Sequence, residues 1–253
     1  IGLFNPMTYQ YSNIAVGANA AGSSLRFQGG VVGPTGNVIM VPRDSANIGV
    51  FNPTTLTLTN VGPIAGQGLS LFGAGVLLPN GNVVMTPLSA GCNIGMYNSY
   101  SLSASGFMNV GSVAVSGTWE SIALAPNGNV IMPPASASNV LVYNPTYTTI
   151  TPGALSNITT NSDGTNKFQG ACLLPSGNII CTPADASNIV MIDPTALTYS
   201  NCGQVWGTSA KFFGCTLMFD GRVVFTPSAA ANVFVVSTMV PPPPEFCLSP
   251  FFN

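Results

Sequence analysis

The chain has 253 residues, of which 46% are hydrophobic and only 5% are charged, and its formal net charge is −2. An ordinary soluble domain carries roughly 25% charged residues, so the polar surface here must be built from Ser, Thr, Asn, Gln and backbone amides. Five scattered basic residues exclude a nucleic-acid-binding patch, and interrupted apolar runs exclude a membrane-inserted helix. This composition is typical of proteins outside a cell or on a particle.

The first predicted elements lie in residues 1–15. The chain begins IGLFNPMTYQYSNI, which aligns with IGVFNPTTLTLTNV from Ile48. Residues 1–15 are therefore predicted to be the third and fourth strands of a blade whose first two strands are absent. Because the first residue is Ile1 rather than Met, we expect the chain to be a processed form or a piece of a longer protein.

A repeat follows, and its five copies are spaced by 44–49 residues. Each copy has an aromatic residue nine positions before a turn glycine, a proline six positions after it and an asparagine eleven or twelve after it. The turn glycines are Gly36, Gly81, Gly128, Gly177 and Gly221. A period of this length indicates a repeat architecture in which each copy is one structural unit.

Each copy is predicted to form four strands. FGAGVLLP and NVVMTP flank Asn80-Gly81, for which we predict a type I′ turn, because Asn-Gly between apolar runs favours positive φ at both residues. A third strand such as NIGMYN and a Thr-rich fourth strand such as TLTLTNV complete the unit. The chain is thus predicted to be all-β, a β-propeller of four-stranded antiparallel blades. An open β-solenoid is disfavoured, because its repeats are usually shorter and lack a hairpin.

The last predicted strand, residues 231–238, is a third strand with no fourth strand behind it. Five inner hairpins favour five blades, with residues 7–15 pairing with residues 231–238 so that the N-terminal strand closes the C-terminal blade. The alternative is a sixth blade whose hairpin would lie upstream of Ile1. Residues 1–238 are then a single propeller domain, and residues 239–253 are a Pro-rich tail that cannot pair in a sheet.

Candidate catalytic chemistry is sparse. The absence of histidine removes Ser-His-Asp and Cys-His sites and histidine-ligated metals. Asp44 and Asp185 share a repeat position and could face each other as glycosidase carboxylates do, but we interpret them as solvated loop residues. Asp163 is the only carboxylate in NSDGTN, and one carboxylate supplies too little negative charge to bind calcium with good affinity. We therefore predict no catalytic residue, no metal, no cofactor and a protein that is not an enzyme.

Two tryptophans are the candidate ligand-binding residues. Trp119 beside Glu120 resembles a sugar platform with a hydrogen-bonding partner, and Gln204 and Trp206 form a similar pair. Trp119 also occupies the aromatic position of the repeat, so the alternative is a packed aromatic at the start of a blade.

The six cysteines show no C-x-x-C spacing, which argues against a zinc or redox site. With Ser176-Gly177 as a two-residue turn, Cys172 and Cys181 are predicted to lie directly opposite each other. Both a strained disulfide and two buried thiols remain open.

The unit LLP-x-GN-V-M-TP…NI-x-x-(Y/F)-NP resembles the kelch-like β-propeller repeats of virion surface and secreted proteins. In blade length it is also similar to five-bladed tachylectin-type lectins, whose hairpins carry a comparable turn, here at Pro79–Gly81 and Pro126–Gly128. The galactose-oxidase branch of kelch-like proteins holds copper with histidine and tyrosine, so its activity does not carry over. The lectin branch binds sugars between blades, and its binding residues do not match this chain one by one.

These observations predict a non-enzymatic binding module on a virion or outside a cell that recognises a glycan or a host-surface receptor. The expected partners are a glycan or a surface protein, together with other subunits of a virion or fibre. The alternative is a structural decoration or scaffold protein that docks on a larger viral assembly through its Pro-rich tail.

Overall fold

The computed structural model describes residues 1–14, 26–64, 71–89, 93–113, 117–151, 153–159, 165–205 and 210–237. Within these ranges the regular structure is 21 strands and one short 3-10 helix, Ala104–Gly106. The chain is all-β, as predicted. Among the described residues, no helix is long and apolar enough to cross a membrane.

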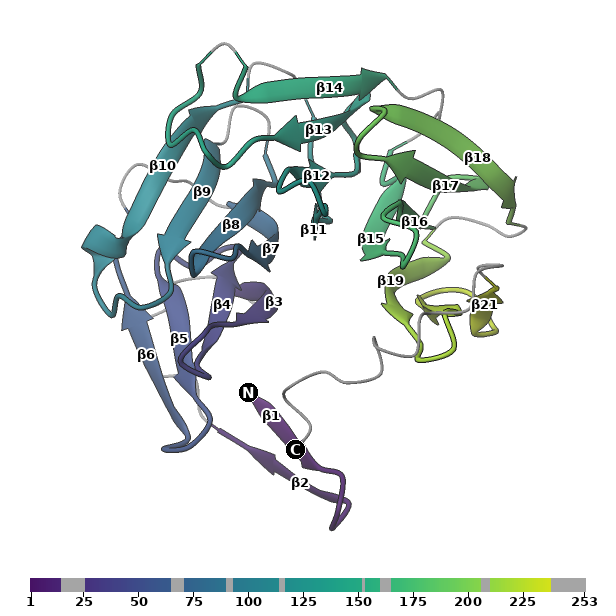
Figure 1. Ribbon diagram of the computed structural model, residues 1–253. Coiled ribbons are helices and arrows are strands. Elements are labelled where there is room, and N and C mark those ends of the chain that lie inside the picture. The colour runs from purple at the N-terminus through teal and green to yellow at the C-terminus, as the bar shows by residue number, and fades with distance from the viewer. Residues whose placement is uncertain are drawn as a thin grey trace. The chain divides into compact units, whose positions relative to one another are not determined.

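The chain divides into two compact units, and the first comprises residues 1–88 and 94–109. It holds a two-stranded hairpin of β1 and β2 and two sheets in the orders β3-β4-β5-β6 and β7-β8-β9-β10. Their bounds are β1 Gly2–Asn5, β2 Gln10–Asn13, β3 Phe27–Val32, β4 Val38–Pro42, β5 Ile48–Asn52, β6 Thr57–Val61, β7 Phe72–Leu77, β8 Asn82–Pro87, β9 Asn93–Asn98 and β10 Phe107–Ser112. Strand β7 lies against β3, so the first strands of these two sheets face each other (Figure 1).

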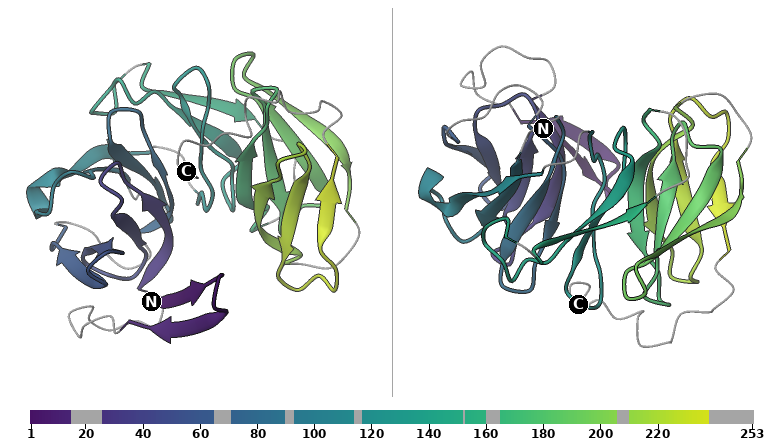
Figure 2. Two further views of the ribbon diagram at one scale, coloured as in Figure 1. Left: turned by 60° about the horizontal axis from the view of Figure 1, so that its bottom comes forward. Right: turned by 90° about the horizontal axis from the view of Figure 1, so that it is seen from above.

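The second unit comprises residues 89–93 and 110–253. It holds the sheets β11-β12-β13-β14, β15-β16-β17-β18 and β19-β20-β21. Their bounds are β11 Ala123–Leu124, β12 Val130–Met132, β13 Asn139–Tyr143, β14 Leu155–Thr159, β15 Phe168–Leu173, β16 Ile179–Pro183, β17 Asn188–Asp193, β18 Thr198–Gln204, β19 Phe212–Leu217, β20 Val223–Pro227 and β21 Phe234–Val236. Strand β15 contacts β11 on one side and β19 on the other, and Figure 2 shows β15–β18 beside β19–β21 in both views.

Each repeat of the sequence forms one antiparallel sheet with its strands in chain order. Four of these sheets have four strands, and the last, β19-β20-β21, has three among the described residues. This is the blade pattern of a β-propeller, and the fold is a five-bladed propeller, as predicted. The division into a domain over residues 1–238 and a tail over residues 239–253 stays a prediction, since the tail lies outside the described residues.

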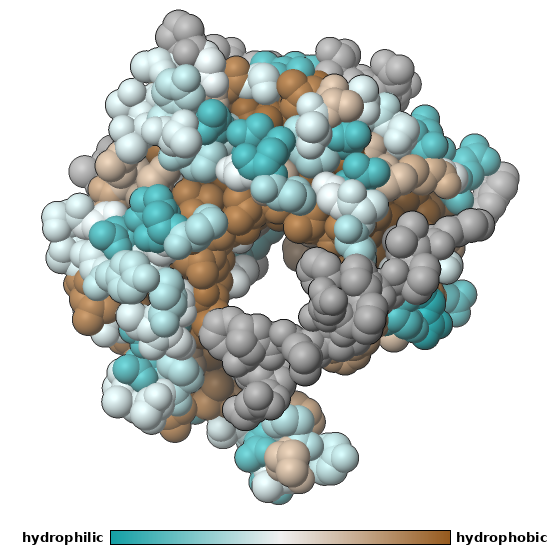
Figure 3. Space-filling view, viewed as in Figure 1, coloured by the Kyte–Doolittle hydropathy of each residue, from teal (hydrophilic) through white to brown (hydrophobic). Residues whose placement is uncertain are grey.

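The aromatic position of the repeat is a core position. Phe72, Trp119, Phe168 and Phe212 are all buried. In the first unit the ring packs over a glycine of the third strand, because a Cβ on Gly95 would lie 2.7 Å from Cζ of Phe72. The outer strands are wetter: β6 alternates between exposed and partly buried residues, and Figure 3 shows a mainly hydrophilic surface over it. In the first four repeats the second and third strands are therefore largely buried, and an outer strand such as β6 is polar.

The inner turn differs from the predicted type I′ turn. Gly81 N–H donates to Leu78 O at 2.9 Å, and Leu78 N–H donates to Asn82 O at 2.7 Å. Gly81 has φ +84°, whereas Asn80 is not among the described residues with positive φ. Pro79 holds the first central position, where its fixed φ suits a type I turn, and glycine then forms the bulge. The prediction was wrong because it ignored the proline before Asn-Gly.

This turn changes the position of the cysteines. It shifts the register by one residue, so that Cys172 faces Ile180 and Cys181 faces Ala171. The predicted opposition of Cys172 and Cys181 is therefore wrong. Both are free thiols, and the side chain of Cys172 instead forms a hydrogen bond with Cys215 of the neighbouring β19.

The N-terminal segment forms a local hairpin. Gly2 pairs with Asn13 and Asn5 with Gln10, while the Asn5 side chain accepts hydrogen bonds from the N–H groups of Met7 and Thr8 at 2.9 and 3.2 Å. Residues 7–15 were predicted to pair with residues 231–238. Among the described strand pairs, β2 is bonded to β1 and β21 to β20. Closure of the C-terminal blade by the N-terminal strand therefore stays a prediction.

Candidate functional site

The predicted ligand-binding residues lie in different environments. Trp119 is 1% exposed, and its Nε1–H donates to Asn139 O at 3.0 Å, so it is the packed aromatic of the alternative interpretation. Glu120 is half-buried and accepts a hydrogen bond from Gln169 Nε2 at 3.0 Å. Gln204 is exposed at the end of β18, and Trp206 lies outside the described residues. The binding role of this set stays a prediction.

The acidic residues that the sequence suggested for catalysis or calcium binding also lie in different environments. Asp185 accepts a hydrogen bond from Ala210 N–H at 2.6 Å and thereby joins the loop after β16 to the start of the next blade. Burial lowers the pKa of the nearby Lys211, and the charge of Asp185 partly opposes this shift. Asp44 belongs to the other unit, and Asp163 lies outside the described residues. Asp185 is thus part of a structural contact rather than a fully solvated loop.

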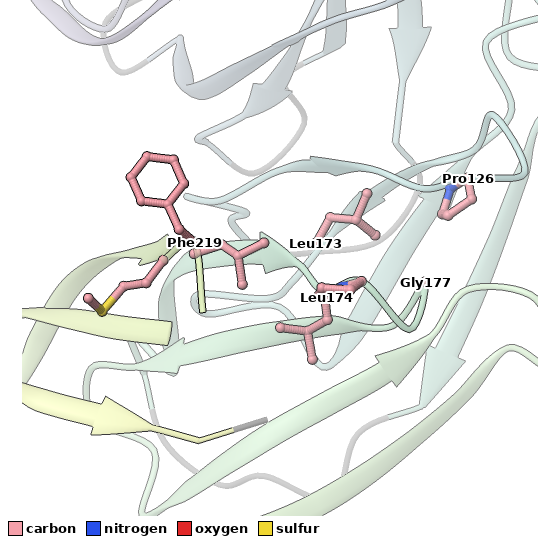
Figure 4. Close-up of a pocket in the computed structure, with 8 residues that line it drawn as sticks. Pro126, Leu173, Leu174, Gly177 and Phe219 are labelled. Carbon is pink, nitrogen blue, oxygen red and sulfur yellow. The ribbon is translucent and has the colours of Figure 1, made fainter. Parts of the chain in front are cut away.

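The second unit contains an apolar pocket of about 380 Å³. Three inner hairpin turns meet there, those between β11 and β12, β15 and β16, and β19 and β20 (Figure 4). Its lining is Pro126, Leu173–Pro175, Gly177 and Leu217–Phe219. In the close-up Leu173 lies between Phe219 and Pro126, which stand on either side of it.

The hairpins hold these side chains by their backbone hydrogen bonds. Leu174 N–H donates to Asn178 O at 2.8 Å and Met218 N–H to Arg222 O at 2.7 Å, so both turns are closed in the same way. A Cβ on Gly177 would lie 3.6 Å from Cγ of Pro126, which places the two turns in contact. Asn127 Nδ2 also donates to Pro194 O at 3.0 Å. Rigid turns therefore position the lining side chains.

Apolar side chains of the lining remain exposed. Phe219 is 82% exposed, Leu173 38%, Met218 37% and Leu217 36%. The one described ion pair of the last turn, Asp220 with Arg222 at 2.6 Å, lies outside the lining. Clustered exposed apolar side chains mark binding surfaces, and covering them would contribute about 25 cal/mol per Å² of buried apolar area.

A departure from the repeat could have revealed this site. Four repeats place a proline two residues before the turn glycine, and the last repeat has Phe219 there. At the preceding position the first and third repeats have the small residues Gly33 and Ala125, whereas the other three have Leu78, Leu174 and Met218. Sequence reasoning used the shared positions to define the fold and missed the positions at which copies differ.

The comparisons with known proteins bear on the fold. No protein family model matches the sequence, and no curated protein matches it either. Streptogramin B lyase matches in structure with a TM-score of 0.70 and 13% identity, over 94% of this chain and 76% of that chain. Virginiamycin B lyase from Staphylococcus aureus matches with a TM-score of 0.66 and 13% identity, over 88% and 73%.

A surface protein shares the same likeness. PorZ, a bacterial surface component of the type-IX secretion system of Porphyromonas gingivalis, has a TM-score of 0.62 and 13% identity, over 86% of this chain and 33% of that chain. Identities this low show the fold alone. The matches extend to 660 solved chains, so the fold does not specify an activity.

The prediction that the protein is not an enzyme needs correction. It rested on the absence of histidine and of paired carboxylates. The structural neighbours include lyases, so this fold does support catalysis. The exclusion was wrong because it treated the familiar nucleophilic and glycosidase sites as the only chemistry that a propeller can carry.

Proposed function

We propose that the protein is a binding module that acts outside a cell or on a virion and recognises a surface protein through the apolar pocket. The observation that carries the proposal is the cluster of exposed Leu173, Leu217, Met218 and Phe219 on two neighbouring hairpins, beside Pro126 of a third. Such a cluster binds by burying apolar area around an aromatic or aliphatic anchor.

The lining favours a protein segment over a glycan. Sugar recognition needs side chains that hydrogen-bond to hydroxyl groups, and the side chains of this lining are Pro, Leu, Met and Phe. A peptide anchor such as Leu, Phe or Pro has no polar group that would be left without a partner on burial. The volume of about 380 Å³ falls within the usual range of ligand pockets, roughly 300–1,000 Å³.

Two of the comparisons relate to this proposal. PorZ is a surface component, which supports a location outside the cell. The lyase of Staphylococcus aureus has a catalytically inactive variant in which a histidine is replaced by alanine. This chain has no histidine, so an activity of that kind would need another group.

The test is a binding panel on the full chain. A random-peptide display library and a glycan array would be probed with the wild-type protein and with Phe219→Ser, using Leu102→Ser as the matched control. Leu102 is 61% exposed and lies in the other unit. We expect the selected peptides to carry aromatic, leucine or proline anchors and to lose at least about tenfold in affinity with Phe219→Ser, corresponding to roughly 1.4 kcal/mol.

Ionic strength supplies a second readout. With few charges to screen, peptide affinity should change by less than about threefold between low and high salt. Selection of glycans alone, or peptides that bind Phe219→Ser as well as the wild type, would contradict the pocket as the recognition site.

A further inference from the structure

The end of the last described strand lies beside the pocket. Val236 of β21 is directly opposite Val223 of β20, and Val223 follows the turn that Met218 and Arg222 close. Leu217–Phe219 on the other side of this turn line the pocket. The chain therefore leaves the sheet at the end where the pocket lies, rather than at the opposite end.

The sequence that follows is suited to an apolar pocket. Residues 238–253, which we call the Pro/Phe segment, contain four consecutive prolines followed by Phe246, Leu248, Phe251 and Phe252, with Glu245 as the one charged residue. About nine residues connect Ser237 to Phe246, enough to reach roughly 30 Å when extended. Proline has little conformational freedom to lose, so a proline-rich segment docks at a low entropic cost.

We propose that the Pro/Phe segment occupies the apolar pocket of its own chain, as an internal ligand that an external partner must displace. The inference rests on the proposal that this pocket is the recognition site, and it adds the identity of a competing occupant. An aromatic side chain of the segment would cover the exposed faces of Phe219 and Leu173, which no described residue buries.

The covalent connection between the Pro/Phe segment and β21 explains why the occupant belongs to the same chain. A short linker whose length matches the span gives an effective concentration in the millimolar range, which exceeds the concentration of a second copy at micromolar protein. A segment with a dissociation constant near 0.1 mM would then occupy the pocket most of the time. An external ligand would bind roughly tenfold more weakly than to an empty pocket.

Photocrosslinking in the full chain tests the proposal. With p-benzoylphenylalanine in place of Phe246, irradiation should yield a crosslinked product of monomer mass. Its proteolytic fragments should join position 246 to residues 173–177 or 217–219. A crosslink of dimer mass would assign the occupant to a second copy, and crosslinks spread over other surfaces would show that the segment does not dock; either result overturns the proposal.

Matched variants separate docking from a general loss of structure. Phe219→Ser should reduce the crosslink yield at least about fivefold, and Leu102→Ser should leave it unchanged. Because Phe219 is 82% exposed, its substitution should preserve the circular dichroism spectrum and the melting temperature. An equal yield in both variants would contradict docking at this pocket.

A competition readout distinguishes this inference from the proposed function. In the full chain, Phe246→Ser combined with Leu248→Ser should raise the affinity of a library-selected peptide roughly tenfold. The tenfold loss expected with Phe219→Ser is measured in this double variant, because there no internal ligand competes for the pocket. If peptides bind Phe219-dependently but no crosslink forms, the recognition site stands and the internal ligand fails. If the crosslink forms but no peptide binds either chain, the segment docks and the external recognition function fails.

Discussion

At the scale of single residues, the turn glycines show how one backbone conformation can be required for two different reasons. Gly81 and Gly128 both have positive φ, +84° and +85°. A Cβ on Gly81 would lie 2.3 Å from Cε2 of Tyr100, whereas a Cβ on Gly128 would meet no atom within 4 Å. The two positions therefore share the cost of backbone strain but differ in the steric cost.

We expect Gly81→Val to lower the free energy of unfolding by about 1–2 kcal/mol or more, because valine resists positive φ and the Tyr100 ring must move. In Gly128→Val only the backbone strain applies, so the free energy of unfolding should fall by less than in Gly81→Val. Urea denaturation of both variants measures the difference. Equal losses at the two positions would show that Tyr100 moves away at no cost.

Trp119 provides a second test at this scale. Because its ring is 1% exposed and its Nε1–H is bonded to Asn139 O, Trp119→Ala should cost about 3–5 kcal/mol of stability. Trp119→Phe keeps most of the ring and should cost less. Thermal unfolding measures both variants. An unchanged melting temperature of Trp119→Ala would contradict the packed position of this residue and favour the interpretation of Trp119 as an exposed sugar platform.

At the scale of elements, the repeat predicted the strands well because it reflects local requirements. Alternation, Asn-Pro-Thr turns and buried aromatic residues each concern neighbours within one sheet. The contact between Cys172 and Cys215 depends instead on how β15 and β19 approach, and a Cβ on Gly170 would lie 2.9 Å from Cα of Gly214 there. The pocket likewise needs three turns to meet. Contacts between sheets were not predictable from the period of the repeat.

The thiol contact has a measurable consequence. The hydrogen bond from Cys215 lowers the pKa of Cys172, whereas burial raises the pKa of Cys181 and that of Cys202. A lowered pKa means that the thiolate, the form that reacts, is present at lower pH. The pH midpoint of iodoacetamide labelling should therefore be lower for Cys172 than for Cys202, and native Cys181 should resist labelling.

Peptide mass spectrometry after labelling at a series of pH values follows each cysteine separately. Comparing midpoints rather than rates removes the difference in access between the half-buried Cys172 and the exposed Cys202. In Cys215→Ala the donor is lost, and the midpoint of Cys172 should rise. A midpoint unaffected by this change would show that the thiol pair does not set the reactivity.

At the scale of the whole molecule, composition and fold restrict function in different ways. A charge of −2 with 5% charged residues argues against nucleic-acid partners, while the propeller fold is shared by lyases and by a surface component. Neither observation identifies a ligand. The function is better argued from where the copies of the repeat diverge, because shared positions build blades and divergent positions such as Phe219 are available for binding.

Closure of the propeller can be tested from the hairpin itself. Ile1 and Ile14 exchange both backbone hydrogen bonds, at 2.7 and 2.8 Å. Hydrogen-bonded pairs alternate along an antiparallel pair of strands, so the backbone N–H of Ser12 also points toward β1. The N–H of Tyr11 then points to the opposite edge of β2, where residues 231–238 are predicted to pair.

A proline at position 11 removes that N–H and leaves the bonds of β1 intact. If the N-terminal strand closes the last blade, Tyr11→Pro should lower the free energy of unfolding by about 1–3 kcal/mol relative to Tyr11→Ala, because a bonded carbonyl of the last blade loses its donor. Tyr11→Ala controls for the exposed ring and its bond to Asn13 Oδ1. Equal urea midpoints for the two variants would show that the outer edge of β2 is unpaired.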